Sequence, residues 1–247
     1  DRAKYLGDSD FYPVPIDSLL NPAYLASRME GFSMEKATPS DSVQSGSFQL
    51  LVESFETTHT SVADEYGNAV AVTTTLNLNY GSKVIVQGAG FLLNDEMDDF
   101  SSKPGVPNYF GLVGAEANAI QPGKRMLSSM TPTIIEKDSS LYMVLGAPGG
   151  STIITSVLQT ILNVIEFQMT ADQAVSAPRF HHQWLPDVIN CESNAIDTLH
   201  RSKLWQMGHQ LKNVERMALM KAIVVLPDKR LHGAGDPRNP DDHAAGY

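Results

Sequence analysis

Residues 56–77 read ETTHTSVADEYGNAVAVTTTLN, and this stretch predicts a β-hairpin. The run 57–62 is rich in residues of high β-propensity, and the run 69–75 alternates small and β-branched side chains. Between them, residues 64–68 have the composition of a tight turn. The hairpin therefore places the beginning of the first strand beside the end of the second.

The threonine that opens this hairpin is a candidate nucleophile. Antiparallel pairing lets Thr57 face Thr75 and Asn77, which can orient its hydroxyl. A threonine inside a chain has no base of its own, whereas a threonine at a chain terminus has an α-amino group with a reference pKa of about 8. The competing interpretation is a threonine-rich surface strand without a catalytic role, and the hairpin alone favours it.

Further motifs lie along the whole chain. Residues 94–100 read NDEMDDF, 124–132 read KRMLSSMTP and 145–151 read LGAPGGS, while 178–184 read PRFHHQW and 235–238 read GDPR. In this order and spacing, together with the threonine pair that opens the hairpin, they closely resemble the bacterial γ-glutamyltranspeptidases. Members of that family are N-terminal-nucleophile hydrolases, which cut their own precursor before the catalytic threonine.

The resemblance implies a division of the chain at the Glu56–Thr57 bond. Residues 1–56 resemble the last part of the family's large subunit, including the approach to the self-cleavage site, and residues 57–247 resemble a complete small, catalytic subunit. Most of the large subunit is absent from this sequence. The segment 37–48 is rich in Ser, Thr, Pro and Gly, which indicates a flexible linker.

The resemblance also implies roles for individual residues. Thr57 matches the threonine that attacks the γ-glutamyl carbonyl, and Thr75 matches the threonine that hydrogen-bonds it. Carboxylates suit an ammonium ion, and hydroxyls can donate to a carboxylate. The matching residues for the α-amino group are Asn77, Glu96 and Asp99, and those for the α-carboxylate are Ser128 and Ser129.

A glycine pair is a candidate oxyanion site on chemical grounds alone. Gly149 and Gly150 have no side chains and stand just before a predicted helix, whose N-terminus carries partial positive charge. The competing interpretation is a strand-to-helix turn that needs glycine for its conformation.

Residues 104–111 resemble the lid loop of many bacterial members, in which a tyrosine closes over the pocket. Here Tyr109 precedes Phe110, whereas the expected tyrosine would stand at position 110. Which aromatic side chain covers the substrate therefore stays open.

Periodicity and turn chemistry predict an α+β fold, and the resemblance implies the four-layer αββα sandwich. A second hairpin is predicted over 133–136 and 141–145, and a third over 222–226 and 230–232. Three helices are predicted, each with a terminal signal: one after Ser151 as N-cap, one opened by a Thr170–Gln173 capping box, and one over 195–207 that stops at Gly208.

Composition excludes several function classes. The chain has 247 residues, 42% of them hydrophobic, and a formal net charge of −10, which argues against nucleic acid or an anionic membrane as a partner. No run approaches the roughly 20 apolar residues of a membrane span. Cys191 is the single cysteine, so no disulfide can form within the chain.

We expect no metal and no cofactor. The acidic loop 95–99 lacks the spacing of a calcium-binding EF-hand loop. His181 and His182 are adjacent, so in a strand they point to opposite faces, and they are assigned to structure together with His59.

The resemblance implies γ-glutamyl transfer from glutathione and related compounds to water or to amino acid and peptide acceptors. It also implies a large-subunit partner and a periplasmic or secreted location, with the signal peptide outside this chain. Two alternatives stay open. The first is a β-lactam side-chain (glutaryl or cephalosporin) acylase. Its glutaryl-like substrates lack an α-amino group, so the carboxylate at Asp99 favours γ-glutamyl substrates over this alternative. An uncleaved, inactive precursor fragment is favoured by the continuous numbering through Glu56 and Thr57.

Overall fold

The computed structural model describes residues 1–43, 57–108 and 111–246. Its helices are α1 (Arg2–Tyr5), α2 (Ile16–Leu19), α3 (Pro22–Met29), α4 (Thr152–Ile165), α5 (Ala171–Ser176) and α6 (Thr198–Gln206), with 3₁₀ turns η1 (Ser40–Ser42), η2 (Glu96–Asp99) and η3 (Glu116–Asn118). Its strands are β1 (Thr58–Ala63), β2 (Ala69–Thr74), β3 (Thr133–Lys137), β4 (Ser140–Gly146), β5 (Phe180–His181), β6 (Ile189–Cys191), β7 (Leu211–Asn213), β8 (Lys221–Val225) and β9 (Leu231–Gly235).

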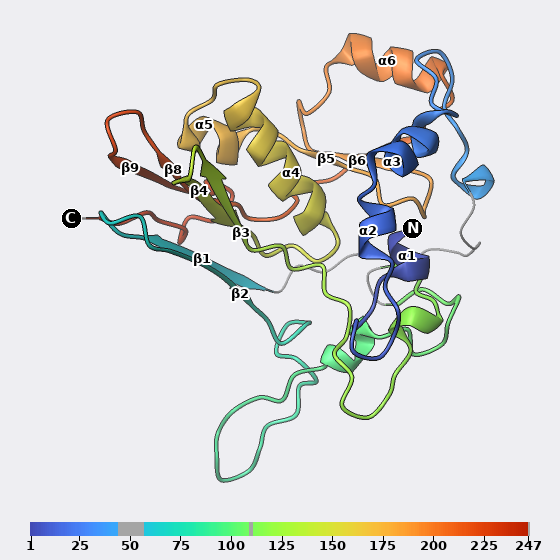
Figure 1. Cartoon of the computed structure of the whole chain (residues 1–247), viewed down its shortest axis with the longest axis horizontal. Coiled ribbons are helices and arrows are strands. Elements are labelled where there is room, and N and C mark those ends of the chain that lie inside the picture. Colours follow the sequence, from blue (N-terminus) through green and yellow to red (C-terminus); the bar gives the residue numbers. More distant parts are fainter. Residues whose placement is uncertain (44–56, 109–110, 247) are drawn as a thin grey trace.

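Two sheets face each other in the body of the molecule (Figure 1). Strands β1 and β2 pair antiparallel, with Thr58 opposite Thr74 and Ala63 opposite Ala69. The second sheet has the strand order β3-β4-β8-β9; β1 and β2 pack against its central strand β4, and β1 also packs against the other central strand, β8. The hairpin that begins at Thr57 is thereby held against the strand that leads to the glycine pair.

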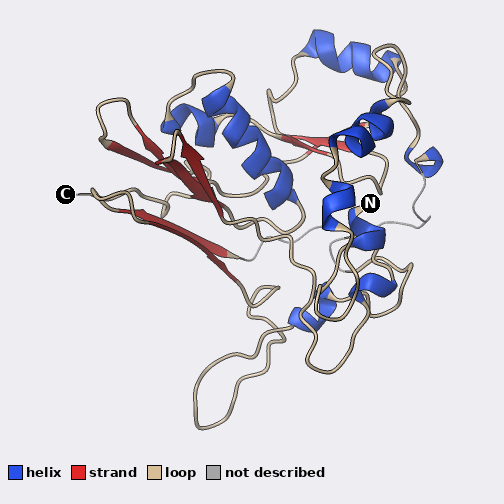
Figure 2. Cartoon of the chain, in the orientation of Figure 1, coloured by secondary structure: helices blue, strands red, loops and turns tan. Residues whose placement is uncertain are grey.

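Helices α4 and α5 cover the other face of the four-stranded sheet (Figure 2). Their apolar residues form the core with side chains from β4 and β8, because α4 presents apolar positions at helical spacing. Fully buried members of this core are Met143, Leu145, Ile153, Val175 and Met220.

The predicted α+β class is confirmed by this arrangement. The described residues form three of the four predicted layers: α4 with α5, the four-stranded sheet, and the β1–β2 sheet. The outer face of the β1–β2 sheet carries Val62, Val70 and Val72, which are about half exposed. An apolar sheet face of this kind is one that another layer normally covers.

All three predicted hairpins and the α5 capping box are confirmed. Two predictions about helix ends were only partly correct. Ser151 stands at the N-cap of α4, but its hydroxyl donates to Gln183 Oε1 at 2.7 Å instead of capping the helix. Helix α6 begins at Thr198, because the Asp197 carboxylate caps it by accepting from the His200 amide at 2.9 Å.

Residues 37–43 of the predicted linker 37–48 are described and contact a distant part of the chain, and the flexibility of the segment stays a prediction. The Ser40 amide donates to Asp187 Oδ2 at 2.9 Å, and the Trp184 indole donates to the Ser40 carbonyl at 2.9 Å. Both contacts join Ser40 to the loop that contains Trp184 and Asp187. The remainder of the segment lies outside the described residues.

Candidate active site

One small pocket gathers most of the residues predicted for the site. Thr57 immediately precedes β1 and Thr75 immediately follows β2, so the hairpin register places them side by side. The Thr57 hydroxyl donates to Thr75 Oγ1 at 3.4 Å, and the Asn77 amide donates to the same oxygen at 2.8 Å. The pocket is lined by Thr57, Thr75, Asn77, Asp99, Ser128, Ser129, Met130, Gly150 and Ile153.

His59 fixes the nucleophile strand on the neighbouring sheet. Its Nδ1 lies 2.7 Å from Thr73 Oγ1 and its Nε2 lies 3.0 Å from Ser61 Oγ. A Cβ on Gly146 would lie 2.3 Å from the imidazole, so the ring packs directly on the backbone of β4. Burial, followed by the charge of Lys221, lowers the pKa of His59 to about 4, so the ring is neutral at pH 7.

The glycine pair is required by conformation and by space. Gly149 has φ +145° and Gly150 has φ +53°, which lie in the region that side chains rarely adopt. A Cβ on Gly149 would lie 2.6 Å from the Cα of Ala218. Gly150 lines the pocket, whereas Gly149 is buried beside it, and the Thr152 hydroxyl closes the turn by donating to the Gly149 carbonyl at 2.7 Å.

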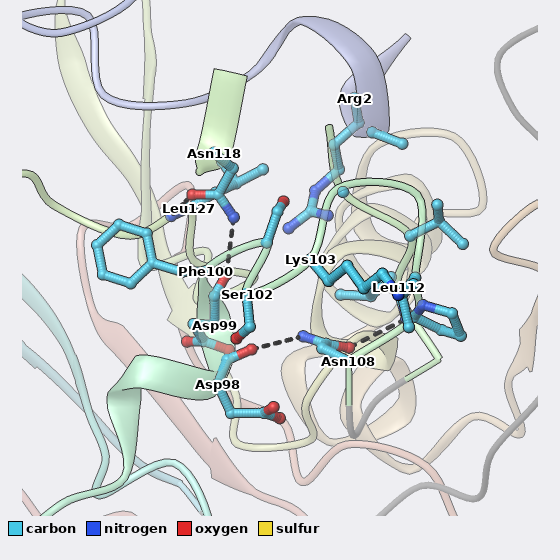
Figure 3. A pocket seen from close by; sticks show the side chains of 16 residues that line it. Arg2, Asp98, Asp99, Phe100, Ser102, Lys103, Asn108, Leu112, Asn118 and Leu127 are labelled. Carbon is cyan, nitrogen blue, oxygen red and sulfur yellow. Dashed lines mark hydrogen bonds between the residues drawn. The ribbon is translucent and has the colours of Figure 1, made fainter. Parts of the chain in front are cut away.

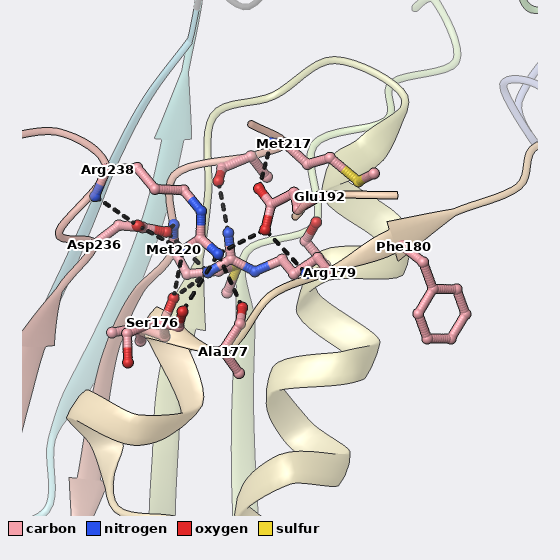
Figure 4. A network of polar contacts seen from close by, with 12 residues as sticks. Ser176, Ala177, Arg179, Phe180, Glu192, Met217, Met220, Asp236 and Arg238 are labelled. Carbon is pink, nitrogen blue, oxygen red and sulfur yellow. Dashed lines mark hydrogen bonds and ion pairs between the residues drawn. The ribbon is translucent and has the colours of Figure 1, made fainter. Parts of the chain in front are cut away.

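A buried polar network, shown in Figure 4, fixes the segment that packs against this turn. Arg179 pairs with Asp236 at 2.8 Å and donates to the Ala218 carbonyl at 2.9 Å. The Leu219 amide donates to the Pro148 carbonyl at 3.0 Å, and the Ala218 amide donates to Thr152 Oγ1 at 3.3 Å. The segment that packs on Gly149 is therefore fixed by an ion pair with almost no solvent exposure.

A second arginine completes the charges of this network. Arg238 contacts Glu192 at 2.6 Å and Asp236 at 2.9 Å (Figure 4). Two guanidinium groups thus face two carboxylates, which is what burial of charge requires. The GDPR motif at the end of the chain is consequently part of the support of the site.

The acidic end of the pocket is electrostatically unbalanced. Burial, followed by the neighbouring carboxylates of Glu96 and Asp98, raises the pKa of Asp99 to about 7. Burial also raises the pKa of Glu96, whose carboxylate oxygens are buried although the residue does not line the pocket. Buried carboxylates with raised pKa values favour binding of a cation that would restore their ionised form.

The serine end of the pocket contacts a cation that sequence reasoning missed. The Arg2 guanidinium donates to Ser129 Oγ at 3.1 Å and to the Ser128 carbonyl at 3.4 Å. Arg2 also borders a cavity of about 110 Å³ that Asp99 shares (Figure 3). No local pattern marks Arg2 in the sequence, because its partners lie more than a hundred positions away.

Asp8 binds the opposite end of residues 125–129, which we call the serine segment. Its carboxylate accepts from the Arg125 amide at 2.9 Å, from Arg125 Nε at 3.0 Å and from an Arg125 terminal nitrogen at 2.5 Å. These bonds keep the pKa of Asp8 well below its usual range. The short segment from Arg125 to Ser129 is therefore tied at both ends to residues 1–8.

Three predicted positions lie outside the described residues: Glu56 at the cleavage site, and Tyr109 and Phe110 in the lid. In the part of the chain that is described, no helix is long and apolar enough to cross a bilayer. Within the same residues, no group of three His, Cys, Asp or Glu side chains has the arrangement of a metal site.

The comparisons with known proteins give consistent matches. The family model described as Gamma-glutamyltranspeptidase matches residues 1–246. The glutathione hydrolase proenzyme of Escherichia coli (strain K12) is 49% identical over 248 residues, which cover 100% of this chain and 42% of that relative. The chain therefore spans about two fifths of the length of the curated relatives that it matches.

Solved structures agree. A mutant gamma-glutamyltranspeptidase of Helicobacter pylori is 53% identical with a TM-score of 0.72, covering 74% of this chain and 100% of that chain. The cephalosporin acylase of Bacillus halodurans has a TM-score of 0.80 over 100% of this chain and 42% of that chain, at 22% identity, and shares the fold alone. These likenesses confirm the predicted fold class, the α+β sandwich of the N-terminal-nucleophile hydrolase type.

Proposed function

Because this chain belongs to the γ-glutamyltranspeptidase family, we propose that it carries the catalytic site of a γ-glutamyltransferase and glutathione hydrolase. The observation that supports this most is the single pocket that joins a threonine pair, a buried carboxylate, two serines and a glycine turn. A nucleophile, an oxyanion site, an ammonium site and a carboxylate site are the parts that a γ-glutamyl amide needs.

The first proposed step is self-cleavage before Thr57. Its hydroxyl oxygen attacks the Glu56 carbonyl carbon, the peptide C–N bond breaks, and the nitrogen becomes a free α-amino group while an ester forms. Water then hydrolyses the ester and restores the hydroxyl. The requirement for this step is chemical, since no α-amino base exists at residue 57 until that bond is cut.

In the proposed catalytic cycle, Thr57 Oγ1 attacks the γ-glutamyl carbonyl while its α-amino group accepts the hydroxyl proton. Thr75 orients the hydroxyl through the contact at 3.4 Å. The amides of Gly149 and Gly150 are the proposed donors to the tetrahedral oxyanion. The leaving amine takes the proton, and water or an acceptor amine then resolves the acyl-enzyme.

The proposed substrate grip favours γ-glutamyl over glutaryl compounds. Asp99 accepts from the α-ammonium group together with Asn77, and the charge of Glu96 strengthens the attraction. Ser128 and Ser129 donate to the α-carboxylate. A glutaryl group has no ammonium to offset the desolvation of Asp99, which weakens the acylase alternative.

The proposed division of the chain is a large-subunit end, residues 1–56, and a small subunit, residues 57–247. A solved H. pylori chain that is covered in full by about three quarters of this chain supports this division. The proposed partners are the rest of the large subunit, which would cover the exposed valines of β1–β2, and glutathione with amino acid or peptide acceptors. A periplasmic or secreted location is part of the proposal.

Intact mass and turnover test the proposal in the full-length precursor that contains this chain. We expect a ~20 kDa species beginning at Thr57 and hydrolysis of a γ-glutamyl anilide. Thr57→Ala should leave the chain uncut and lower turnover by at least about 10⁴-fold. Thr58→Ala, a change at an exposed neighbour, is the control and should still cleave. Efficient cleavage of Thr57→Ala would refute the nucleophile assignment.

Residues 1–247 produced alone test the division of labour. We expect little or no hydrolysis of the γ-glutamyl anilide, with activity restored when the rest of the large subunit is supplied. Full activity from this chain alone would contradict the proposed need for that partner.

A further inference from the structure

Asn118 uses both ends of its side-chain amide to join two parts of the site. It is buried and closes the η3 turn. Its Nδ2 donates to the Asp99 carbonyl at 2.8 Å, and its Oδ1 accepts from the Leu127 amide at 2.9 Å (Figure 3). The Ser101 amide donates to the Asn118 carbonyl at 2.9 Å, so the backbone strengthens the same connection.

The two residues that Asn118 joins belong to opposite ends of the substrate grip. Asp99 carries the carboxylate proposed to bind the α-ammonium group. Leu127 immediately precedes Ser128, which is proposed to bind the α-carboxylate. In a γ-glutamyl substrate these two charged groups stand on one carbon atom, so the distance between their binding residues must be held closely.

We propose that Asn118 is a positioning residue that sets the spacing between Asp99 and Ser128, and thereby selects ligands with an ammonium and a carboxylate group on the same carbon. This inference rests on the proposed γ-glutamyl function of the site. It goes beyond that function because it assigns the selectivity to a side chain that does not line the catalytic pocket.

The chemistry of the bridge requires an amide of this length. One end must donate to a carbonyl and the other must accept from an amide, and asparagine carries its donor and its acceptor on two separate atoms. Aspartate lacks the donor, serine is too short to reach both partners, and glutamine is one methylene longer in a buried position.

The turn that carries Asn118 has little freedom to move. A Cβ on Gly7 would lie 2.0 Å from the Ala117 carbonyl oxygen, so residues 6–8 press directly on η3. The backbone amide of Asn118 donates to the Ala115 carbonyl at 3.0 Å. Because the turn is held in place, the length of the Asn118 side chain fixes the distance between Asp99 and Leu127.

The test uses the full-length precursor with Asn118→Ser, and L-glutamate and glutarate as competitive inhibitors of γ-glutamyl anilide hydrolysis. L-glutamate has both charged groups on one carbon, and glutarate has only carboxylates. We expect the inhibition constant of L-glutamate to rise about 10-fold, with that of glutarate changing less than about twofold. In the variant, KM for the anilide should rise together with the inhibition constant of L-glutamate, while kcat changes little.

Asn108→Ser is the matched control. Asn108 makes the same kind of bridge in the same cavity, from the Asp98 carbonyl at 3.3 Å to the Leu112 amide at 3.1 Å, but it does not join Asp99 to the serine segment (Figure 3). We expect it to change both inhibition constants by similar factors. Thermal unfolding verifies that each variant is folded, and Asn118→Thr replaces Asn118→Ser if the latter is not.

The outcomes separate this inference from the proposed function. A wild-type precursor without γ-glutamyl turnover would refute the function itself. An active wild type, with equal factors for L-glutamate and glutarate in the Asn118 variant, would refute the inference alone. A fall in kcat with unchanged KM would refute it as well, because a spacing device acts on binding.

Discussion

The sandwich and the loops around it hold their parts of the site by different means. The sandwich, β1 to β4 with α4, α5, β8 and β9, contains most of the buried apolar side chains of the described residues. In the loops between β2 and β3, described for residues 75–108 and 111–132, the buried apolar residues are Phe100 and Ala117 alone. The loops are fixed instead by hydrogen bonds from Asp8, Asn118 and their partners.

This difference corresponds to a division of chemical work. The nucleophile and the glycine turn stand on the apolar sandwich, where close packing tolerates little change. The groups proposed to hold the substrate stand on loops tied by polar contacts. Damage to the sandwich should therefore reduce kcat and stability, whereas damage to the loops should mainly raise KM. The five predictions below test this contrast, beginning with the largest effect.

Gly149→Ala should have the largest effect of the five. The added Cβ would lie 2.6 Å from Ala218 Cα at a φ of +145°, so the turn must shift and change the position of its amides relative to the nucleophile. We expect kcat to fall about 10²- to 10³-fold, as for loss of one oxyanion donor, with KM changing much less. Gly31→Ala, at a glycine with open space around it, is the control. Unchanged kcat in Gly149→Ala would remove the glycine turn from the proposed mechanism.

His59 should make the sandwich sensitive to acid. Its pKa in the folded protein is about 4 against an ordinary value of 6.5, so the unfolded chain takes up a proton that the folded protein does not. Stability should therefore fall as the pH is lowered from about 6.5 to 4, by up to roughly 3 kcal/mol. Denaturant unfolding of wild type and His59→Gln between pH 7 and pH 4 measures this. Parallel pH profiles would show that His59 contributes nothing to the acid sensitivity.

Asp99→Asn should distinguish substrates. Removal of the carboxylate should raise KM about 10- to 100-fold for a γ-glutamyl anilide and much less for a glutaryl anilide, because only the former has an ammonium group. KM of the wild type for the γ-glutamyl substrate should fall as the pH rises through about 7, where Asp99 ionises. Equal losses for both substrates would exclude Asp99 as the ligand of the ammonium group.

The same carboxylate should cost stability. Because its pKa is raised, folded Asp99 keeps a proton that the unfolded chain has lost. Wild-type stability should therefore fall as the pH rises from about 4 to about 7. Asp99→Asn should therefore raise Tm at pH 8 and leave it nearly unchanged at pH 4. A lower Tm of the variant at pH 8 would contradict this sign.

Arg125→Gln should have the smallest effect. It removes side-chain bonds to Asp8, but the backbone bond from residue 125 to the same carboxylate remains. We expect KM to rise about threefold through a looser serine segment, with kcat unchanged. Arg230→Gln, which breaks an exposed pair with Asp228, should change neither constant. A large fall in kcat would place Arg125 in the catalytic step and weaken the contrast between the two regions.

The sequence by itself determined the local elements and the short motifs. The hairpin of residues 57–75, the helix after Gly150 and the capping box at Thr170 follow from periods and end signals that span a few residues. The glycine pair and the acidic loop were recognisable for the same reason. The parallel pairing of β6 with β7 was not predicted, because its strands are three residues long and far apart in the chain.

Only the tertiary structure decided which groups meet. Arg2 contacts Ser129, Asp8 contacts Arg125, and Asn118 joins Asp99 to Leu127. None of these contacts has a local signature, because a side-chain hydrogen bond depends on position and direction in space and not on spacing along the chain. The sequence thus determined the chemical groups of the site, and packing of distant segments determined their distances, their burial and the raised pKa of Asp99.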